Sequence, residues 1–381
     1  MSGAIEAPPL AHYRAEFPVF DRQIYLNTCS LGALSRRTRA RVLAFLDEWD
    51  ARGSAAWYDA WWGALDALRR RYAALINAPP RDVALHAAVS TATGVLASAL
   101  DYQARPRVVT TSLDFPTVAY QWLAKRPAGV EVIVVESVDG VSVPLEAFAR
   151  AIDDRTALVA TSHVFFTSGY VLDIRGLAEL AHARGAWCYV DAYQSVGQIP
   201  VDVQASGVDF LTAGGLKWLL GGPGIVFLYV RGEITTRLRP TVTGWFAHQE
   251  QFRFDSRQLD FHDDARRFEQ GTPALAAVHA QLGGLDVLED VGLDRVFAAT
   301  RDLTEDLISR ARAAGLRPKV AADSGHRSAI VMIPVDDPAR EVRRLSSAGI
   351  VADSRHGHVR LSPFFYNTPD DHERAIHVLT S

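Results

Sequence analysis

The sequence predicts an α/β fold with a mostly parallel sheet of seven strands between layers of helices, followed by a smaller C-terminal α+β domain. Between residues 83 and 230, short runs rich in β-branched residues alternate with longer segments of helical periodicity. Beyond about His262 this alternation ends, and two long helical segments precede further strands. A chain of 381 residues also exceeds the roughly 250 to 300 residues of one core. We therefore expect an N-terminal segment 1–14, a large domain 15–262 and a small domain 263–381.

The predicted elements of the large domain begin with a helix over Trp57–Ile76, which Asn77 and two prolines terminate. The strands expected after it are Val83–Leu85, Arg107–Thr111, Val130–Val135, Ala157–His163, Ala186–Val190, Val208–Thr212 and Ile225–Val230. The helices expected between them are Thr93–Leu100, Pro116–Lys125, Leu145–Ile152 and Ile174–Arg184. The glycine-rich GGLKWLLGGPG before the last strand is too short for a parallel crossover, so this strand is expected to be antiparallel.

The small domain is predicted to start with two helices, Pro273–Leu288 and Val296–Ala314. Strands Ala329–Ile333 and Val359–Ser362 follow, with helices beside them.

Composition and charge disfavour several classes of protein. The net charge of -4 provides no basic field for nucleic acid. Two cysteines, Cys29 and Cys188, are too few for a disulfide framework, and neither cysteines nor histidines show zinc-ligand spacing. No apolar run reaches the roughly 20 residues of a membrane helix, and the start MSGAIEAPPL lacks the pattern of a signal peptide. We expect a cytoplasmic protein with no nucleic-acid, membrane or metal partner.

Polar residues follow several of the predicted strands, at the edge where parallel sheets bind ligands. They are Asp191 with Gln194, Lys217 in a glycine-rich turn, Ser90, Thr91 and Thr93 at a helix start, and Asp114 with Phe115. Singly, such residues are usually caps or solvated side chains. Together they match the needs of pyridoxal 5'-phosphate, which are a lysine amine, a carboxylate at the ring nitrogen, phosphate donors and a flat apolar contact.

Each residue type suits its expected role. Lys217 is predicted to form a Schiff base, because a lysine amine loses its proton readily when desolvated. Asp191 is expected to keep the pyridine nitrogen protonated, and Gln194 to donate to the ring oxygen. Ser90, Thr91 and Thr93, with the amides of the helix they open, form the predicted phosphate site, and Phe115 is expected to stack on the ring.

The chain resembles the class V aminotransferase group of fold-type-I pyridoxal-phosphate enzymes, in particular its kynureninase-like and isopenicillin N epimerase-like branch. The stretches that carry the resemblance are YLNTCSLG, DFPT, SHVFFTSGY, DAYQSVG, GWFAH, RFEQGTP and FYNT. It covers nearly the whole chain and implies that the large domain binds the cofactor.

The resemblance also implies further site residues. Gly271 and Thr272 match a pair that reaches the phosphate from the neighbouring subunit, which implies a homodimer with shared active sites. Arg355 and Arg360 match arginines that hold a substrate carboxylate; a structural ion pair is the alternative for both. The remaining implied positions are Ala92 and His163 at the cofactor, and Cys29 and Phe166 near the substrate.

Departures from the group's patterns narrow the expected chemistry. Arg355 is followed by His356, Gly357 and His358, so the nucleophilic cysteine of cysteine desulfurases is absent. Leu216 stands immediately before the lysine, where many relatives have a polar phosphate ligand, and Phe166 stands where some have asparagine.

The predicted function is chemistry at the α-carbon of an amino-acid-like substrate, by an aminotransferase or a kynureninase-like lyase. An epimerase, a carbon–sulfur β-lyase and a non-catalytic relative that binds the cofactor remain open alternatives, since the scaffold alone does not choose among them.

Overall fold

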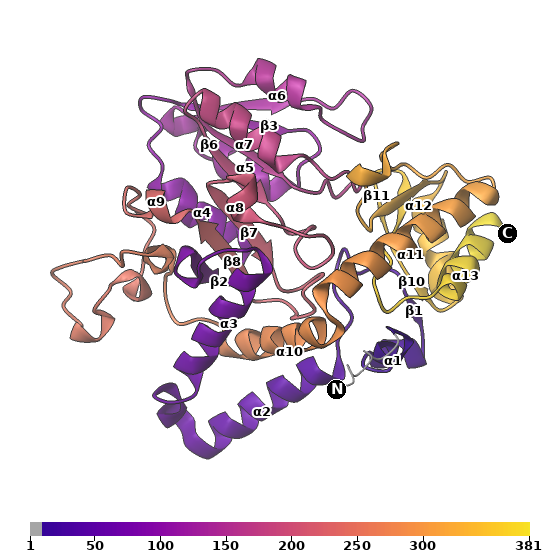
Figure 1. Ribbon diagram of the computed structural model, residues 1–381, viewed down its shortest axis with the longest axis horizontal. Coiled ribbons are helices and arrows are strands. Elements are labelled where there is room, and N and C mark those ends of the chain that lie inside the picture. Colours follow the sequence, from indigo (N-terminus) through magenta and orange to yellow (C-terminus); the bar gives the residue numbers. More distant parts are fainter. Residues whose placement is uncertain (1–9) are drawn as a thin grey trace, which may run out of the picture.

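The computed structural model describes residues 10–381 and shows a large α/β lobe joined to a smaller one (Figure 1). Of the predicted N-terminal segment, residues 1–9 lie outside the described part, and so does most of the stretch used to judge the signal peptide. The described remainder of the segment forms helix α1, Leu10–Arg14.

The large lobe is built on a seven-stranded sheet with the strand order β2-β8-β7-β6-β5-β3-β4. The strands are β2 Val83–His86, β3 Arg107–Thr111, β4 Glu131–Val135, β5 Thr156–Ser162, β6 Trp187–Asp191, β7 Phe210–Gly214 and β8 Val226–Val230. Only β8 runs antiparallel to its neighbours. The predicted fold class and the antiparallel last strand are confirmed.

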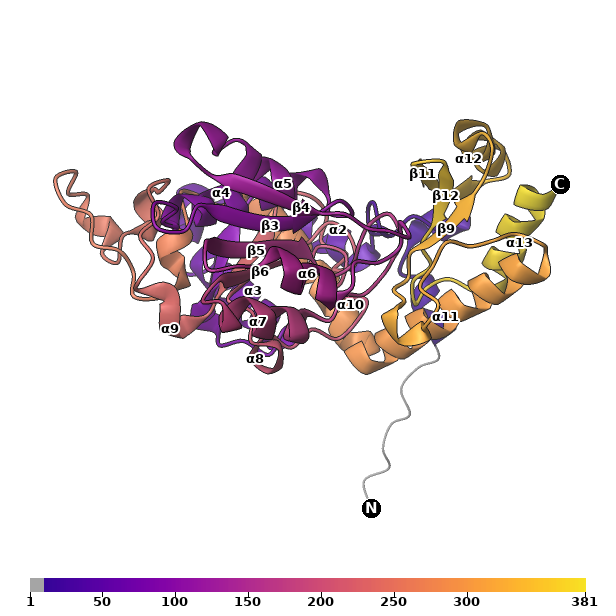
Figure 2. The same ribbon diagram turned by 90° about the horizontal axis from the view of Figure 1, so that it is seen from above.

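Helices cover both faces of this sheet. The helices on one face include α3 Trp61–Leu75, α6 Leu145–Ala151, α7 Ile174–Ala183, α8 Val203–Ser206 and α10 Leu275–Val291. Those on the other face include α4 Val89–Ala99 and α5 Pro116–Leu123 (Figure 2). Because both faces are covered, β5 and β8 are buried along their whole length, and β8 is apolar throughout.

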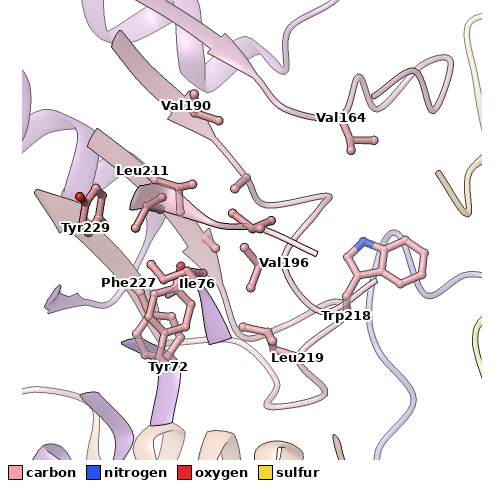
Figure 3. Close-up of a cluster of buried hydrophobic side chains, with 14 of the residues drawn as sticks. Tyr72, Ile76, Val164, Val190, Val196, Leu211, Trp218, Leu219, Phe227 and Tyr229 are labelled. Atoms are coloured by element: carbon pink, nitrogen blue, oxygen red, sulfur yellow. The ribbon is translucent and has the colours of Figure 1, made fainter. Parts of the chain in front are cut away.

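The apolar core beneath the sheet reaches the turn that carries Lys217. Tyr72 of α3 stacks on Phe227 of β8 with the ring centroids 3.8 Å apart. The same cluster continues through β6 and β7 to Trp218 and Leu219, next to the lysine (Figure 3). The lysine turn is therefore attached to a close-packed interior.

The smaller lobe combines a three-stranded antiparallel sheet with three helices. Its elements are β9 Val331–Pro334, β11 Asp353–Arg355, β12 His358–Leu361, α11 Leu293–Ala313, α12 Pro338–Ser347 and α13 Pro369–Thr380. An N-terminal strand, β1 Ile24–Tyr25, joins this lobe by pairing in parallel with β10 Ile350–Val351.

The hydrophobic clusters do not follow the predicted domain limits everywhere. Ile24 and Leu26 belong to the core of the small lobe, although residues 15–262 are predicted to form the large domain. Helix α10 packs into the core of the large lobe, although it follows residue 262. The limits 15–262 and 263–381 thus stay a prediction, with these two segments packed across them.

Two helices differ from the prediction. The helix predicted over Trp57–Ile76 is interrupted, because a 3-10 helix, Gly53–Trp57, and a turn precede α3. Helix α2, Arg36–Arg52, is not among the predicted elements, because charged residues interrupt its apolar positions. Its one clear signal is Ser35, whose hydroxyl accepts a hydrogen bond from the amide of Thr38 as an N-cap. Within residues 10–381, no helix has the length and apolarity needed to cross a membrane.

Replacing Phe227 by alanine tests the importance of the Tyr72 stack. We expect Phe227→Ala to lower the free energy of unfolding by about 3 to 5 kcal/mol, because the fully buried ring leaves a cavity. Urea denaturation followed by circular dichroism measures this change. The control Phe254→Ala removes an exposed ring and should change stability by less than about 0.5 kcal/mol. Equal effects of the two substitutions would contradict this view of the core.

Candidate active site

Several of the predicted cofactor residues converge at the carboxyl edge of the large sheet. Asp191 is the last residue of β6, and Lys217 follows the end of the neighbouring strand β7 by three residues. Strand β5 ends beside β6, so that Ser162 pairs with Asp191 and His163 lies at the same edge. The expected grouping of lysine and carboxylate is therefore present in the structure.

Glycines allow other segments to approach the Lys217 turn closely. The amide of Gly32 donates to the carbonyl of Leu216 at 2.8 Å, and a Cβ at Gly32 would lie 2.2 Å from the carbonyl oxygen of Lys217. Gly197, at φ +102°, abuts the backbone of Trp218 in the same way. Main chain from both lobes thus fixes the turn, and side chains at these positions would push it away.

The surroundings of the Lys217 amine favour its uncharged form. Burial lowers the pKa of Lys217 from 10.5 to about 8. The Cys29 thiol and the Asp191 carboxylate oppose this shift, whereas the charges of Arg360 and Arg355 add to it. An amine with a pKa near 8 is available as a nucleophile and as a base near neutral pH.

The pKa of Asp191 is shifted in the opposite direction to that of Lys217. Burial raises the pKa of Asp191 from 3.8 to about 6, although the amide of Tyr193 donates to its Oδ1 at 2.9 Å. Within the described residues its other oxygen, Oδ2, has no hydrogen-bond partner. A carboxylate oxygen without a donor, on a side chain that is 5% exposed, suits a protonated ring nitrogen that pairs with it.

Two rings lie close to this pair. The Nζ of Lys217 is 4.7 Å from the ring centroid of Tyr193. His163 donates its backbone amide to the carbonyl of Asp191 at 2.9 Å, and burial lowers the pKa of His163 to about 4. Its buried Nδ1 has no hydrogen-bond partner among residues 10–381.

The Gln194 side chain links the loop of Cys29 to the turn that carries Lys217. The Gln194 amide donates to the carbonyl of Cys29 at 2.9 Å and accepts from Nε1 of Trp218 at 2.9 Å. One amide hydrogen of Gln194 remains for the ring oxygen of a cofactor. The loop of Cys29 lies at the site, as the resemblance implies, but the thiol is fully buried, and burial raises its pKa. Cys29 is therefore a packing residue and not a reactive thiol at an entrance.

Helix α4 presents its N-terminus at the same edge of the sheet. Its N-cap residue, Ala88, has no side chain that can accept from the first amides, and the amide of Thr91 donates to the carbonyl of Ala88 at 3.1 Å, so the amides of Val89 and Ser90 are left for an anion. Ser90 is exposed and Thr91 half-buried there, whereas Ala92 is buried and can offer only backbone.

The expectation for the side chain of Thr93 is not supported. Its buried hydroxyl bonds to the carbonyl of Val89 at 2.8 Å and to the Tyr189 hydroxyl at 3.0 Å. It faces the sheet because position 93 lies on the packed side of α4. Thr93 thus stabilises the contact between helix and sheet.

The rings of Phe115 and Phe166 form an apolar rim that His356 borders. Phe115, at the start of α5, contacts Phe166 edge to face at 5.2 Å. Phe166 in turn contacts His356 from the hairpin of the small lobe, at 6.3 Å. Residues of both lobes thus meet at this rim. Phe166 places an aromatic ring where some relatives have asparagine.

Arg360 and Arg355 share one carboxylate. Arg360 is buried and binds Asp353 through Nε at 2.9 Å and Nη2 at 2.7 Å. Arg355 is more exposed, and its Nη2 lies 3.2 Å from the same carboxylate. The ion pair considered as an alternative for these arginines is thus present in the structure.

Gly271 and Thr272 lie apart from these residues. Both are exposed, and Gly271 lines a separate cavity of about 750 Å³ together with Trp62 and Arg69 of α3. This placement leaves them accessible to a second chain.

Four residues of this region are absent from the predicted site. They are Ser30, Tyr193, Trp218 and Asp353. Tyr193 lies between the predicted Asp191 and Gln194, and Asp353 lies two positions before Arg355, so proximity to predicted residues is the signal that points to these two.

The family model for aminotransferase class-V matches residues 41–371. The chain belongs to the aminotransferase class-V family. Its similarity to the uncharacterized aminotransferase YcbU of Bacillus subtilis is 35% identity, covering 96% of this chain and 95% of that protein. A kynureninase of Deinococcus radiodurans is 33% identical over 79% of this chain and 74% of its own length. A kynureninase of Bacillus cereus is 27% identical over 97% and 90%.

Solved structures support the fold of this class-V protein. An apo cysteine desulfurase from Thermococcus onnurineus superposes with a TM-score of 0.88 at 20% identity, covering 99% of this chain and 98% of that one. The cystine C-S lyase C-DES, in complex with cysteine persulfide, gives a TM-score of 0.88 at 19% identity, covering 96% and 99%. Family membership confirms the resemblance, the enzyme class and pyridoxal 5'-phosphate as the cofactor.

The lowered pKa of Lys217 leads to a labelling prediction. Reductive methylation of the cofactor-free protein should modify Lys217 with a midpoint near pH 8, because burial favours the neutral, reactive amine. Mass spectrometry can follow each lysine, since the chain contains only Lys125, Lys217 and Lys319. The Lys217→Arg protein identifies the relevant peptide. Modification of Lys217 that begins only above pH 10 would contradict the proposed surroundings.

Proposed function

We propose that this class-V enzyme binds pyridoxal phosphate through Lys217 and acts at the α-carbon of an amino-acid-like substrate, as an aminotransferase or a kynureninase-like lyase. The observation that carries the proposal is the pairing of a lysine amine of pKa about 8 with a buried carboxylate of pKa about 6, at adjacent strand ends. Groups with pKa values moved in opposite directions are typical of acid–base sites.

The cofactor, when bound, supplies an electron sink for negative charge that develops on the substrate's α-carbon. Lys217 would supply the amine that holds the cofactor, and its Nζ would move the α-proton. Asp191 would pair with the ring nitrogen through Oδ2 and keep it protonated, since a neighbouring cation lowers the pKa of a buried carboxylate. His163, with its unpaired Nδ1, borders the same space, and Phe115 is the predicted stacking partner of the ring.

The phosphate is assigned to the free amides of α4 with the hydroxyls of Ser90 and Thr91. Leu216 offers no polar side chain there, so we propose that Gly271 and Thr272 of a second subunit complete the phosphate site. Their exposure in the single chain supports this role, and it makes a homodimer with shared active sites part of the proposal.

The substrate carboxylate is assigned to Arg360 and Arg355, which lie near enough to Lys217 to lower its pKa. The rim of Phe115 and Phe166 receives the substrate side chain. In this proposal the α-carbon lies between the arginines and the lysine.

Borohydride reduction tests the attachment of the cofactor. Reduction of the cofactor-loaded protein should add a phosphopyridoxyl group to the peptide that contains Lys217, because the neutral amine condenses with the aldehyde. The Lys217→Ala protein should show no such addition, whereas Lys319→Ala should behave as the wild type. Labelling at Lys125 or Lys319 alone in the wild-type protein would reject the assignment.

Product analysis distinguishes the two candidate reactions. A panel of amino acids is incubated with the enzyme, with and without pyruvate, and the products are measured by chromatography. Turnover that depends on pyruvate indicates amino-group transfer, and alanine released without an acceptor indicates kynureninase-type cleavage. Absence of both products for every amino acid, from protein shown by borohydride to carry the cofactor on Lys217, would refute the proposed reactions.

A further inference from the structure

The carboxylate of Asp353 occupies the Nε–Nη2 edge of Arg360, so that a substrate carboxylate is left with Nη1 of Arg360 and with Arg355. Asp353 and Arg360 are direct partners in the antiparallel pairing of β11 and β12, so the backbone fixes their approach. Asp353 takes both Nε and Nη2 of Arg360, which is the geometry that a bidentate ligand carboxylate adopts.

Further contacts hold this carboxylate in place. The Ser30 hydroxyl donates to Oδ2 of Asp353 at 2.5 Å and accepts from Nη2 of Arg360 at 2.7 Å. Arg355 approaches Oδ2 from the hairpin, at 3.2 Å. Although burial opposes it, the hydrogen bonds and charge of Arg360 lower the pKa of Asp353, so this carboxyl group is ionised at neutral pH.

The charges of Arg355, Arg360 and Asp353 determine how many carboxylates of a ligand can be neutralised at this site. Two guanidinium groups and one built-in carboxylate leave a net charge of +1, which one substrate carboxylate neutralises. At Arg360, Nη1 donates one hydrogen to the carbonyl of Phe166 at 3.3 Å, so its second N–H is the donor left for a ligand. A second ligand carboxylate would meet the rim of Phe115 and Phe166 without a cation of its own, and an unpaired buried charge is costly.

We propose that Asp353 is a specificity residue that restricts the site to amino acids with a single carboxylate and an uncharged, mainly apolar side chain. The inference rests on the proposed function, in which Arg360 and Arg355 bind the substrate carboxylate. It extends that function by assigning the discrimination against aspartate-like and glutamate-like substrates to a residue that contacts the arginines and not the cofactor.

The test compares two ligands of equal chain length, butyrate and succinate, which carry one and two carboxylates. Their Kd values are measured by titration calorimetry on the cofactor-loaded wild type and on Asp353→Asn. We expect the substitution to raise the affinity for succinate about tenfold relative to the affinity for butyrate, because it removes one negative charge beside the arginines. The matched control is Asp336→Asn, the same change at an exposed position of the small lobe, and it should leave the ratio unchanged.

Arg355→Gln is the second variant, at a half-exposed side chain whose replacement is compatible with folding. It removes a positive charge, so it should lower the affinity for succinate about tenfold relative to the affinity for butyrate. An unchanged ratio in both variants, with melting temperature alone affected, would overturn the inference and leave Asp353 a structural residue of the hairpin.

The Arg360→Ala variant distinguishes a failure of the selectivity role of Asp353 from a failure of the proposed carboxylate site. If Arg360→Ala weakens butyrate while the ratios stay constant in the two charge variants, only the selectivity role fails. If Arg360→Ala leaves butyrate binding unchanged, the proposed carboxylate site fails and the selectivity role with it.

Discussion

The partial burial that lowers the pKa of the Lys217 amine is the constraint on which the rest of the site depends. An ammonium on a lysine side chain is stable in water, so the protein must surround Nζ to obtain a neutral amine near physiological pH. The turn after β7 achieves this because Trp218 and Leu219 anchor it in the core and glycines let other backbone segments touch it. Asp191 experiences the same surroundings, which raise its pKa and prepare it for a cationic partner.

The N-terminal loop between β1 and α2 connects this constraint to substrate recognition. Gly32 contacts the lysine turn, the carbonyl of Cys29 accepts from Gln194, and Ser30 bridges Asp353 and Arg360. Because β1 pairs with β10, the loop is also attached to the small lobe. Short contacts thus link the arginines of the small lobe to the turn that carries the Lys217 amine.

The sequence alone could predict that Lys217 and Asp191 lie together, and it could predict the sheet whose strands carry them. Asp191 and Lys217 follow buried strands, and the carboxyl ends of parallel strands meet at one edge whatever the loops do. The antiparallel strand β8 was likewise predictable, because the segment before it is too short for a crossover.

Details decided by tertiary contacts could not be predicted in this way. Thr93 is a helix-start residue by sequence, yet the turn of α4 directs its hydroxyl to Tyr189. Cys29 is in a loop that the small lobe buries, and the pairing of Asp353 with Arg360 follows from a hairpin register that no local pattern specifies. Charged α2 was missed because its stability comes from packing on α10 rather than from a clear apolar stripe.

Nitrogen-15 NMR on protein reconstituted with ring-labelled pyridoxal phosphate measures most directly whether Asp191 and Lys217 act as one unit. If the buried carboxylate faces the ring nitrogen, the wild-type signal should be that of a protonated pyridine from about pH 6 to pH 9, and Asp191→Asn should give an unprotonated one. A wild-type ring nitrogen that is unprotonated throughout this range, or a protonated one that is indifferent to Asp191→Asn, would contradict the arrangement described above.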